Sequence, residues 1–356
     1  MRIDRATRYD VVLCDSGLDG LVPILDRVAP GGRAVLFTDS RVMGIHGVGL
    51  HSAIRRSGRE VFVHTVPAGE RSKSFREVTR AWNALVREGV DRKTPLIALG
   101  GGVVGDLGGF VAATYLRGIP LIQVPTTLLA LVDSSVGGKT GVDHPLGKNL
   151  VGAFYQPRAV FSSMEVLRTL PAREYTAGLA EVVKSAVLGD SALFETLEDS
   201  VEAIQAREPA VLRRVISGSV RVKARVVEKD PKERGVRASL NLGHTLAHAI
   251  EQIDGYRGLR HGEAVAVGLA AASRFAQARG WLTERATMRI CALLDALGLP
   301  TRRAGLDVRD VARAMGRDKK AEAARVRFVA PLAIGRTGFR WIPVDELAQE
   351  LVTAAT

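Results

Sequence analysis

The chain has 356 residues, of which 46% are hydrophobic and 25% are charged, close to the averages of globular proteins. This composition excludes a disordered, fibrous or low-complexity chain, and the length exceeds the usual size of a single-core domain, so we expect two domains. The 50 basic and 38 acidic residues give a net charge of +12, which alone is compatible with nucleic acid, a membrane surface or an anionic substrate. No polybasic tail or basic run interleaved with aromatic residues is present, so we do not expect nucleic-acid binding.

The N-terminal residues MRIDRATRYD lack the apolar stretch of a secretory signal, and no apolar run approaches the roughly 20 residues that a membrane helix needs. We therefore expect a cytoplasmic protein without a membrane partner. Cys14 and Cys291 lie far apart and lack metal-type spacing, which argues against a disulfide framework or a zinc ribbon.

The first half of the chain alternates short apolar runs with helical patterns. The runs at residues 11–13, 33–38, 61–66, 95–99 and 121–124 predict strands. Apolar residues at three- and four-residue spacing predict helices at residues 21–27, 48–56 and 75–88. This alternation is typical of an α/β doubly wound nucleotide-binding domain, which we expect to span residues 1–163.

From about residue 164 onward the strand signal nearly vanishes. Helical patterns cover residues 177–188, 211–229, 244–253 and 264–278, and residues 325–330 predict one late β element. We therefore expect a mostly α-helical metal- and substrate-binding domain over residues 164–356.

A glycine cluster follows the strand PLIALG and begins a helical run: GGGVVGDLGG, residues 100–109. Such a turn lets backbone N–H groups at a helix N-terminus approach a pyrophosphate. The spacing differs from G-x-G-x-x-G, however, and a tight turn without a ligand is the alternative. Asp39, at the end of the strand AVLFT, either accepts from a ribose hydroxyl or caps the next helix.

Three segments of the second half carry residues that are hard to explain as packing. The apolar helix AGLAEVVK carries Glu181 and Lys184, the segment NLGHTLAH carries His244 and His248 four residues apart, and His261 begins another helix. Two imidazoles and a carboxylate suit Zn²⁺ or a similar ion with positions left open for substrate. The spacing favours His244 with His248, but His261 is an alternative, and Glu181 with Lys184 alone could be a solvated ion pair.

Residues 125–148 predict a loop rich in anion-binding groups, with GGK and HPLGK segments. The basic residues of this loop and of the second half are either scattered surface cations or, when clustered, a clamp for phosphate and carboxylate groups. They are Lys139, Lys148, Lys184, Lys223 and Arg237.

These motifs together resemble the 3-dehydroquinate synthase family. The segments that carry the resemblance are GGGVVGDLGGFVAATYLRG, QVPTTLLALVDSSVGGKTGVDHPLGKNLVGAFYQP, AGLAEVVK, RASLNLGHTLAHAIE and HGEAVAVGL, within roughly residues 11–340. The resemblance implies the two-domain fold, a homodimer, NAD and one divalent metal ion, zinc or cobalt. Departures are few: Leu246-Ala247 replaces the commoner Phe-Gly, and Ser185 stands where Tyr is frequent.

The resemblance also implies roles for individual residues. Glu181, His244 and His261 would bind the metal, and His248 would contact substrate or move a proton. Arg117 would reach the neighbouring subunit's active site, and Lys319 or Lys320 would belong to a late lysine motif. Further substrate-binding positions would be Asp133, Lys139, Asn149, Lys184, Lys223, Arg237 and Asn241. Cofactor-binding positions would be Asp39, Glu70, Lys73, Gly101, Gly102, Val103, Asp106, Thr126, Thr127, Lys139, Lys148, Thr169 and Leu170.

The activity implied is conversion of 3-deoxy-D-arabino-heptulosonate 7-phosphate into 3-dehydroquinate and phosphate, in the shikimate pathway of aromatic amino acid biosynthesis. The expected partner is thus a small sugar acid phosphate. Two alternatives share the fold: another sugar phosphate cyclase, of the valiolone or deoxy-scyllo-inosose synthase type, and a metal-dependent polyol dehydrogenase.

Overall fold

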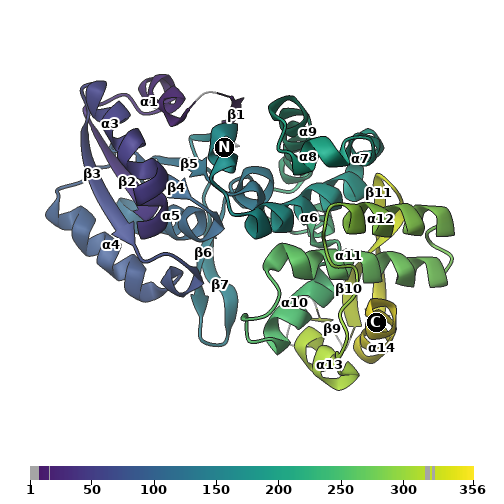
Figure 1. The fold of residues 1–356 in the computed structure, drawn as a ribbon. Helices are drawn as coiled ribbons and strands as arrows, with labels where there is room; N and C mark the ends of the chain where they lie inside the picture. Colours follow the sequence, from purple (N-terminus) through teal and green to yellow (C-terminus); the bar gives the residue numbers. More distant parts are fainter. Residues whose placement is uncertain (1–7, 16, 317–320, 323–324) are drawn as a thin grey trace, which may run out of the picture. The chain divides into compact units, whose positions relative to one another are not determined.

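The computed structural model describes residues 8–15, 17–316, 321–322 and 325–356. It divides the chain into two compact units, Met1–Leu170 and Pro171–Thr356 (Figure 1). The sequence placed the boundary between residues 163 and 164, at the end of strand β8 (Ala159–Ser163), whereas the two compact units meet between Leu170 and Pro171. Among the described residues, no helix combines the length and the apolar character needed to cross a membrane.

The first unit is built on a six-stranded sheet with the order β1-β8-β5-β4-β2-β3, in which every neighbouring pair is parallel. The five predicted strands are confirmed, and so is the doubly wound class. The short run at β8 was missed because it ends in two serines, although all five of its residues are buried. The other strands are β1 (Asp10–Cys14), β2 (Arg33–Asp39), β3 (Glu60–Val66), β4 (Leu96–Gly100) and β5 (Leu121–Pro125).

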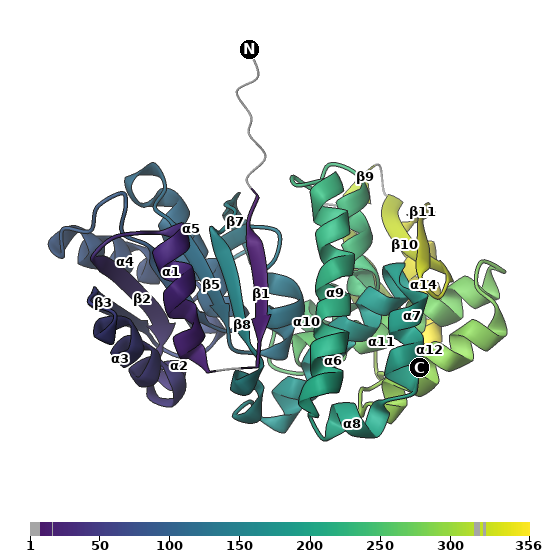
Figure 2. The same cartoon turned by 90° about the horizontal axis from the view of Figure 1, so that it is seen from above.

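Helices cover both faces of this sheet, as the alternation along β2 requires (Figure 2). Ala34 and Leu36 pack with helices α1 and α3, whereas Val35 and Phe37 pack with helices α4 and α5. The helices are α1 (Val22–Val28), α3 (Val48–Arg56), α4 (Phe75–Arg87) and α5 (Gly102–Thr114), with short helical turns α2 (Ser40–Val42), η1 (Leu18–Leu21), η2 (Met43–Gly47), η3 (Glu70–Ser72), η4 (Tyr115–Arg117), η5 (Ala130–Ser134) and η6 (Met164–Arg168).

The predicted loop at residues 125–148 is wrong over its second half, where β6 (Lys139–His144) and β7 (Gly147–Phe154) form an antiparallel hairpin. Two glycines explain both the hairpin and its weak sequence signal. A Cβ at Gly141 would lie 2.6 Å from the Val151 carbonyl oxygen, and one at Gly152 would lie 2.1 Å from that of Thr140. The two backbones therefore approach more closely than side chains would allow, and strand propensity is low where glycine replaces them.

The second unit is mostly helical, as predicted, and the four predicted helices are present. The late β element that was predicted is present as β10, and it is one of three antiparallel strands. The strand β11 was missed because its sequence, RTGFRWIP, places arginines, a threonine and a glycine among the apolar residues. The elements are α6 (Ala172–Gly189), α7 (Ser191–Glu198), α8 (Val201–Gln205), α9 (Pro209–Lys229), η7 (Val236–Asn241), α10 (His244–Ile253), α11 (His261–Ala278), α12 (Glu284–Ala296), α13 (Val308–Gly316), β9 (Ala321–Glu322), β10 (Arg325–Ala333), β11 (Arg336–Pro343) and α14 (Val344–Ala355).

Helix α11 is the centre of this unit, since most of its residues are buried and it packs against α6, α10, α12 and α14. Its contact with the turn before α10 is made by backbone. A Cβ at Gly268 would lie 2.0 Å from the carbonyl oxygen of Gly243. Gly243 itself has φ +77°, a left-handed conformation that glycine adopts without strain.

We predict opposite effects for two helical Gly→Ala substitutions. Gly268→Ala would force the backbone of α11 away from that of Gly243 and should lower the free energy of unfolding by about 1–3 kcal/mol or more. Gly49→Ala, in α3, meets nothing within 4 Å and should stabilise by about 0.5–1 kcal/mol. Urea unfolding midpoints of the two variants measure both effects. A Gly268→Ala midpoint at or above that of the unsubstituted protein would contradict the packing described for α11.

Candidate functional site

The predicted dinucleotide residues gather at the carboxyl ends of three neighbouring strands of the first unit. The strand order reverses direction between β2 and β4, and ligands of open α/β sheets bind outside such a switch point. Here Thr38 Oγ1 donates to the Leu99 carbonyl oxygen at 2.7 Å, and Thr126 N donates to that of Gly100 at 2.9 Å. Asp39 ends β2, Thr126 and Thr127 follow β5, Gly101 links β4 to α5, and Gly102 and Val103 are the first residues of α5.

The predicted order of strand, glycine turn and helix is present, and Gly101 alone separates β4 from α5. A Cβ at Gly101 would lie 3.0 Å from Thr127 Cγ2, so the turn lies close to the chain that leaves β5. Asp39 has the capping role that the sequence left open: its Oδ1 accepts from Arg41 N at 2.8 Å and from Val42 N at 2.9 Å.

A second group of predicted residues lies where the hairpin meets α5. Lys73 is 5% exposed, and its Nζ donates to Asp106 Oδ2 at 2.6 Å and to Asn149 Oδ1. Burial lowers the pKa of Lys73, but the Asp106 carboxylate outweighs it and raises the pKa above its usual value. Lys148 Nζ lies 3.5 Å from Glu70 Oε1. Five predicted residues, from η3, the position after it, α5 and β7, thus form one polar cluster.

The remaining predicted residues of the first unit lie apart along the chain. Arg117 is exposed at φ +65°, directly after Leu116 at φ +49°, two left-handed conformations that strain non-glycine residues. Thr169 Oγ1 lies 2.8 Å from His46 Nε2. Asp133 is half-buried in η5, Lys139 is exposed at the start of β6, and Leu170 is buried. Lys319 and Lys320 lie outside the described residues.

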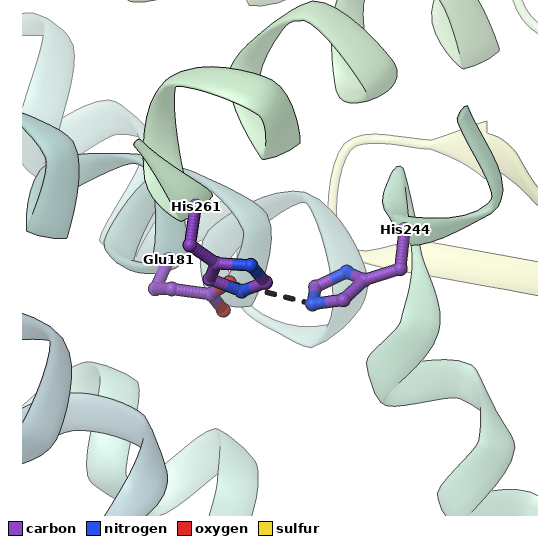
Figure 3. A group of neighbouring side chains, drawn as sticks. All are labelled: Glu181, His244 and His261. Carbon is purple, nitrogen blue, oxygen red and sulfur yellow. Dashed lines mark ion pairs between the residues drawn. The ribbon is translucent and has the colours of Figure 1, made fainter. Parts of the chain in front are cut away.

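In the second unit, three helices bring Glu181, His244 and His261 together; we call these residues the carboxylate–imidazole triad (Figure 3). One ligand atom from each lies within 4.8 Å of the others. The Nε2 atoms of His244 and of His261 each lie 3.6 Å from Glu181 Oε1. Both histidines are the first residues of their helices, and Glu181 is 1% exposed in the middle of α6. The donor set suits a divalent ion of the zinc type.

The Nδ1 atoms of both imidazoles face protein acceptors. His244 Nδ1 lies 3.1 Å from the Leu242 carbonyl oxygen. Burial and the Lys184 ammonium hold the pKa of His244 well below its usual value, so this imidazole is neutral near pH 7. Burial lowers the pKa of His261 too, but hydrogen bonds to Glu181 and Glu251 outweigh it and raise the pKa to about 10. A bound cation would replace that proton.

His248, the other candidate from the sequence, is exposed and lies beside the triad. Its ring centroid is 5.3 Å from that of His244 and 6.4 Å from that of His261. The geometry therefore groups His261, and not His248, with Glu181 and His244.

The start of α11 is fixed to α6 by contacts that sequence reasoning missed. Arg173 donates to both oxygens of Glu263, at 2.7 and 2.8 Å, and Arg260 pairs with Glu174. A Cβ at Gly262 would lie 1.8 Å from the Ala177 carbonyl oxygen. These contacts hold His261, which lies between Arg260 and Gly262. In the sequence, only the segment HGE, in which Gly262 and Glu263 follow His261, marked the start of this helix.

Three cations of the second unit are almost fully buried: Lys184 at 2%, Lys223 at 7% and Arg237 at 1% exposed. We call them the buried cations. The surface-cation interpretation is wrong for all three, and charged groups are rarely buried this far without a charged partner or ligand. Lys184 pairs with Glu181, and Arg237 Nη1 donates to the Pro231 carbonyl oxygen at 2.6 Å. Helices α6, α9 and η7, which carry them, pack against one another.

Asn241 and Glu233 extend this polar region. Asn241 Nδ2 donates to Glu233 Oε1 at 3.3 Å and to the Ala238 carbonyl oxygen at 3.1 Å. Glu233 was not among the predicted residues, because a glutamate in the charged run EKDPKERG carries no distinguishing spacing.

We predict that His244→Ala and His248→Ala differ in metal binding. The unsubstituted protein should bind one equivalent of Zn²⁺. His244→Ala should weaken binding by more than the roughly 10- to 100-fold that loss of an outer-sphere partner costs, whereas His248→Ala should keep one equivalent. Metal content after dialysis and competition with a chromophoric chelator measure this. Equal loss of metal from His244→Ala and His248→Ala would instead favour the pair spaced four residues apart.

Comparison with known proteins agrees with this arrangement. Residues 63–177 match the family described as 3-dehydroquinate synthase N-terminal, and residues 178–321 match 3-dehydroquinate synthase C-terminal. A 3-dehydroquinate synthase of Symbiobacterium thermophilum is 50% identical over 85% of this chain and 85% of that protein. One of Rippkaea orientalis is 41% identical over 97% of this chain and 94% of that protein.

A solved structure shares the whole fold. The 2-epi-5-epi-valiolone synthase of Streptomyces hygroscopicus, with NAD⁺ and Zn²⁺ bound, matches with a TM-score of 0.91 and 27% identity, covering 100% of this chain and 99% of that one. The two family matches and the identity of 41–50% to relatives of similar length decide the assignment, as the motifs predicted. The chain belongs to the 3-dehydroquinate synthase family.

Proposed function

We propose that this protein is a 3-dehydroquinate synthase that converts 3-deoxy-D-arabino-heptulosonate 7-phosphate into 3-dehydroquinate and phosphate. The observation that carries the proposal is the presence of three buried cations in the same compact unit as the carboxylate–imidazole triad. A substrate with both a carboxylate and a phosphate needs several cations, and a polyol needs none. Relatives at 41–50% identity bear this activity in their names.

The proposal assigns NAD to the first unit and one divalent ion, zinc or cobalt, to the triad of the second. The related valiolone synthase holds NAD⁺ and Zn²⁺, which supports this pair of cofactors. When bound, the dinucleotide supplies a reversible hydride acceptor and the ion supplies a Lewis acid for a substrate hydroxyl. The glycine turn would face the pyrophosphate. Contacts to the rest of the dinucleotide would come from the strand-end residues, from Thr169 and Leu170, and from Glu70, Lys73, Asp106 and Lys148.

In the second unit the chain's own groups would bind and orient the substrate. Arg237 and Lys223, with Asn241 beside them, would bind its carboxylate, and Lys184 would hold an anionic oxygen while it pairs with Glu181. Oriented this way, the substrate would release its phosphate as the adjacent C–H bond breaks, and the departing phosphate would accept the proton. His248, exposed beside the triad, is suited to move a proton at its imidazole nitrogen.

Several assignments remain proposals on the family resemblance. Asp133, Lys139 and Asn149 would contact substrate from the first unit, and Lys319 or Lys320 would do so from the late lysine motif. Arg117 would reach the active site of a neighbouring subunit in a homodimer, and the strained, exposed turn that carries it is consistent with a functional position. The enzyme would act in the cytoplasm, in the shikimate pathway.

The assay that tests the function uses purified, metal-loaded protein, the heptulosonate phosphate and a catalytic amount of NAD. We expect phosphate and dehydroquinate in equal amounts with no net NADH, because the hydride returns to the product. Faster turnover of a sugar phosphate without a carboxylate would mean a valiolone- or inosose-type cyclase. Accumulation of NADH would mean a polyol dehydrogenase.

We predict that Lys223→Met lowers kcat/KM by about 10- to 150-fold, since a charge-assisted hydrogen bond contributes about 1.5–3 kcal/mol. The matched control is Lys229→Met, six positions further along α9, where the side chain is exposed. The control should change kcat/KM less than about twofold. Equal effects of the two substitutions on kcat/KM would exclude Lys223 from substrate binding.

A further inference from the structure

Helix α10 carries a polar stripe that continues past its two histidines. His244, His248 and Glu251 are spaced by four and three residues, so they lie on the same face of the helix. Glu251 is 8% exposed, although the mechanism proposed above gives it no task. A carboxylate is seldom buried on a helix face without a specific partner.

The ring of His261 is a partner of Glu251. Both carboxylate oxygens lie 3.4 Å from His261 Nδ1. The opposite nitrogen, Nε2, lies 3.6 Å from Glu181 Oε1, on the side where the triad converges. Glu251 therefore holds the ring by the nitrogen that does not face the triad, which distinguishes it from a fourth ligand.

The two imidazoles of the triad differ in how much support they need. The side chain of His244 is 10% exposed, and a backbone carbonyl oxygen accepts from its Nδ1 side. The side chain of His261 is 35% exposed, so packing restrains its rotation less. An imidazole whose N–H donates to a carboxylate is also a stronger metal ligand than one whose N–H donates to a neutral carbonyl group. The more exposed ring thus has the stronger acceptor.

We propose that Glu251 is a positioning residue that fixes the tautomer and orientation of His261 and thereby sets the affinity of the triad for its divalent ion. The inference rests on the proposed function only in that the triad binds a metal. Helix α10 then contributes twice, with His244 as a ligand at its first residue and Glu251 as the support of a ligand on α11.

The test compares Zn²⁺ dissociation constants, from competition with a chromophoric chelator, of the full-length protein and its Glu251→Ala and Glu251→Gln variants. We expect Glu251→Ala to weaken Zn²⁺ binding by about 10- to 100-fold. Glu251→Gln keeps an acceptor oxygen without the charge, so its loss should be smaller. The d–d absorption of the Co²⁺-loaded variants should change relative to the unsubstituted protein, because the His261 ring is no longer fixed.

The matched control is Glu77→Ala, which removes a buried helical carboxylate of the first unit that is 5% exposed and pairs with Arg80. This variant should lower the thermal midpoint and leave the Zn²⁺ dissociation constant unchanged. Equal Zn²⁺ affinity of Glu251→Ala and the unsubstituted protein overturns the inference alone. An equal loss of Zn²⁺ affinity in Glu77→Ala also overturns the inference, since the effect of Glu251→Ala would then be general destabilisation. Failure of the unsubstituted protein to bind Zn²⁺ or Co²⁺ overturns the proposed metal site as well.

Discussion

Direct backbone contact between α11 and its neighbours is the constraint on which the second unit depends. At Gly262 a side chain would collide with the carbonyl of α6, and at Gly268 with the carbonyl that precedes α10. Side chains normally keep helix axes 8–10 Å apart, so glycine at these contacts permits a closer approach. That approach brings the first residues of α10 and α11 beside the middle of α6, where Glu181 lies. The triad is therefore a consequence of helix packing more than of any local motif.

The buried charges are the cost of this arrangement. Glu181, Lys184 and Arg237 are nearly inaccessible to water, and the transfer of each charge out of water has an electrostatic cost that its interactions in the protein must offset. The apolar bodies of α6 and α11, which are buried along most of their length, offset this cost. An excess of buried cations also creates a field that favours an anionic ligand. Binding such a ligand would relieve the electrostatic cost that folding leaves in the site, which links stability to function.

Apolar runs and helical periodicity were sufficient to predict an element wherever its buried side chains pack against an apolar core. It found five strands of the parallel sheet and the long helices, because β2 is a short run of continuously buried residues and α4 repeats its buried positions at helical spacing. It failed where glycine replaces side chains, as at Gly141 and Gly152 in the hairpin, since a missing side chain leaves no pattern. It failed again in β11, where arginines interrupt the apolar residues.

Prediction of the site residues from the sequence was limited for a related reason. Helix geometry correctly places His244 and His248 on one face, yet which of the three imidazoles lies in the triad depends on where α11 begins relative to α10. That depends on contacts between distant residues, such as Arg173 with Glu263, 90 positions apart. The residues alone left His261 as an alternative to His248, and only the family resemblance favoured His261 in advance. Glu251 carried no signal of its own, because its task exists only once His261 is in place.

The two units position their functional groups in a similar way. In the first, Gly101 and Gly102 stand where a buried strand ends and a helix begins; in the second, His244 and His261 are first residues of helices whose later turns are buried. A helix start combines unpaired backbone N–H groups with a rigid body behind it. Groups at such positions are accessible to a ligand and still held by the core. Substitutions deep in α11 should therefore displace the first turn of that helix, and with it His261. Core packing thus affects the chemistry of the site through the position of this turn.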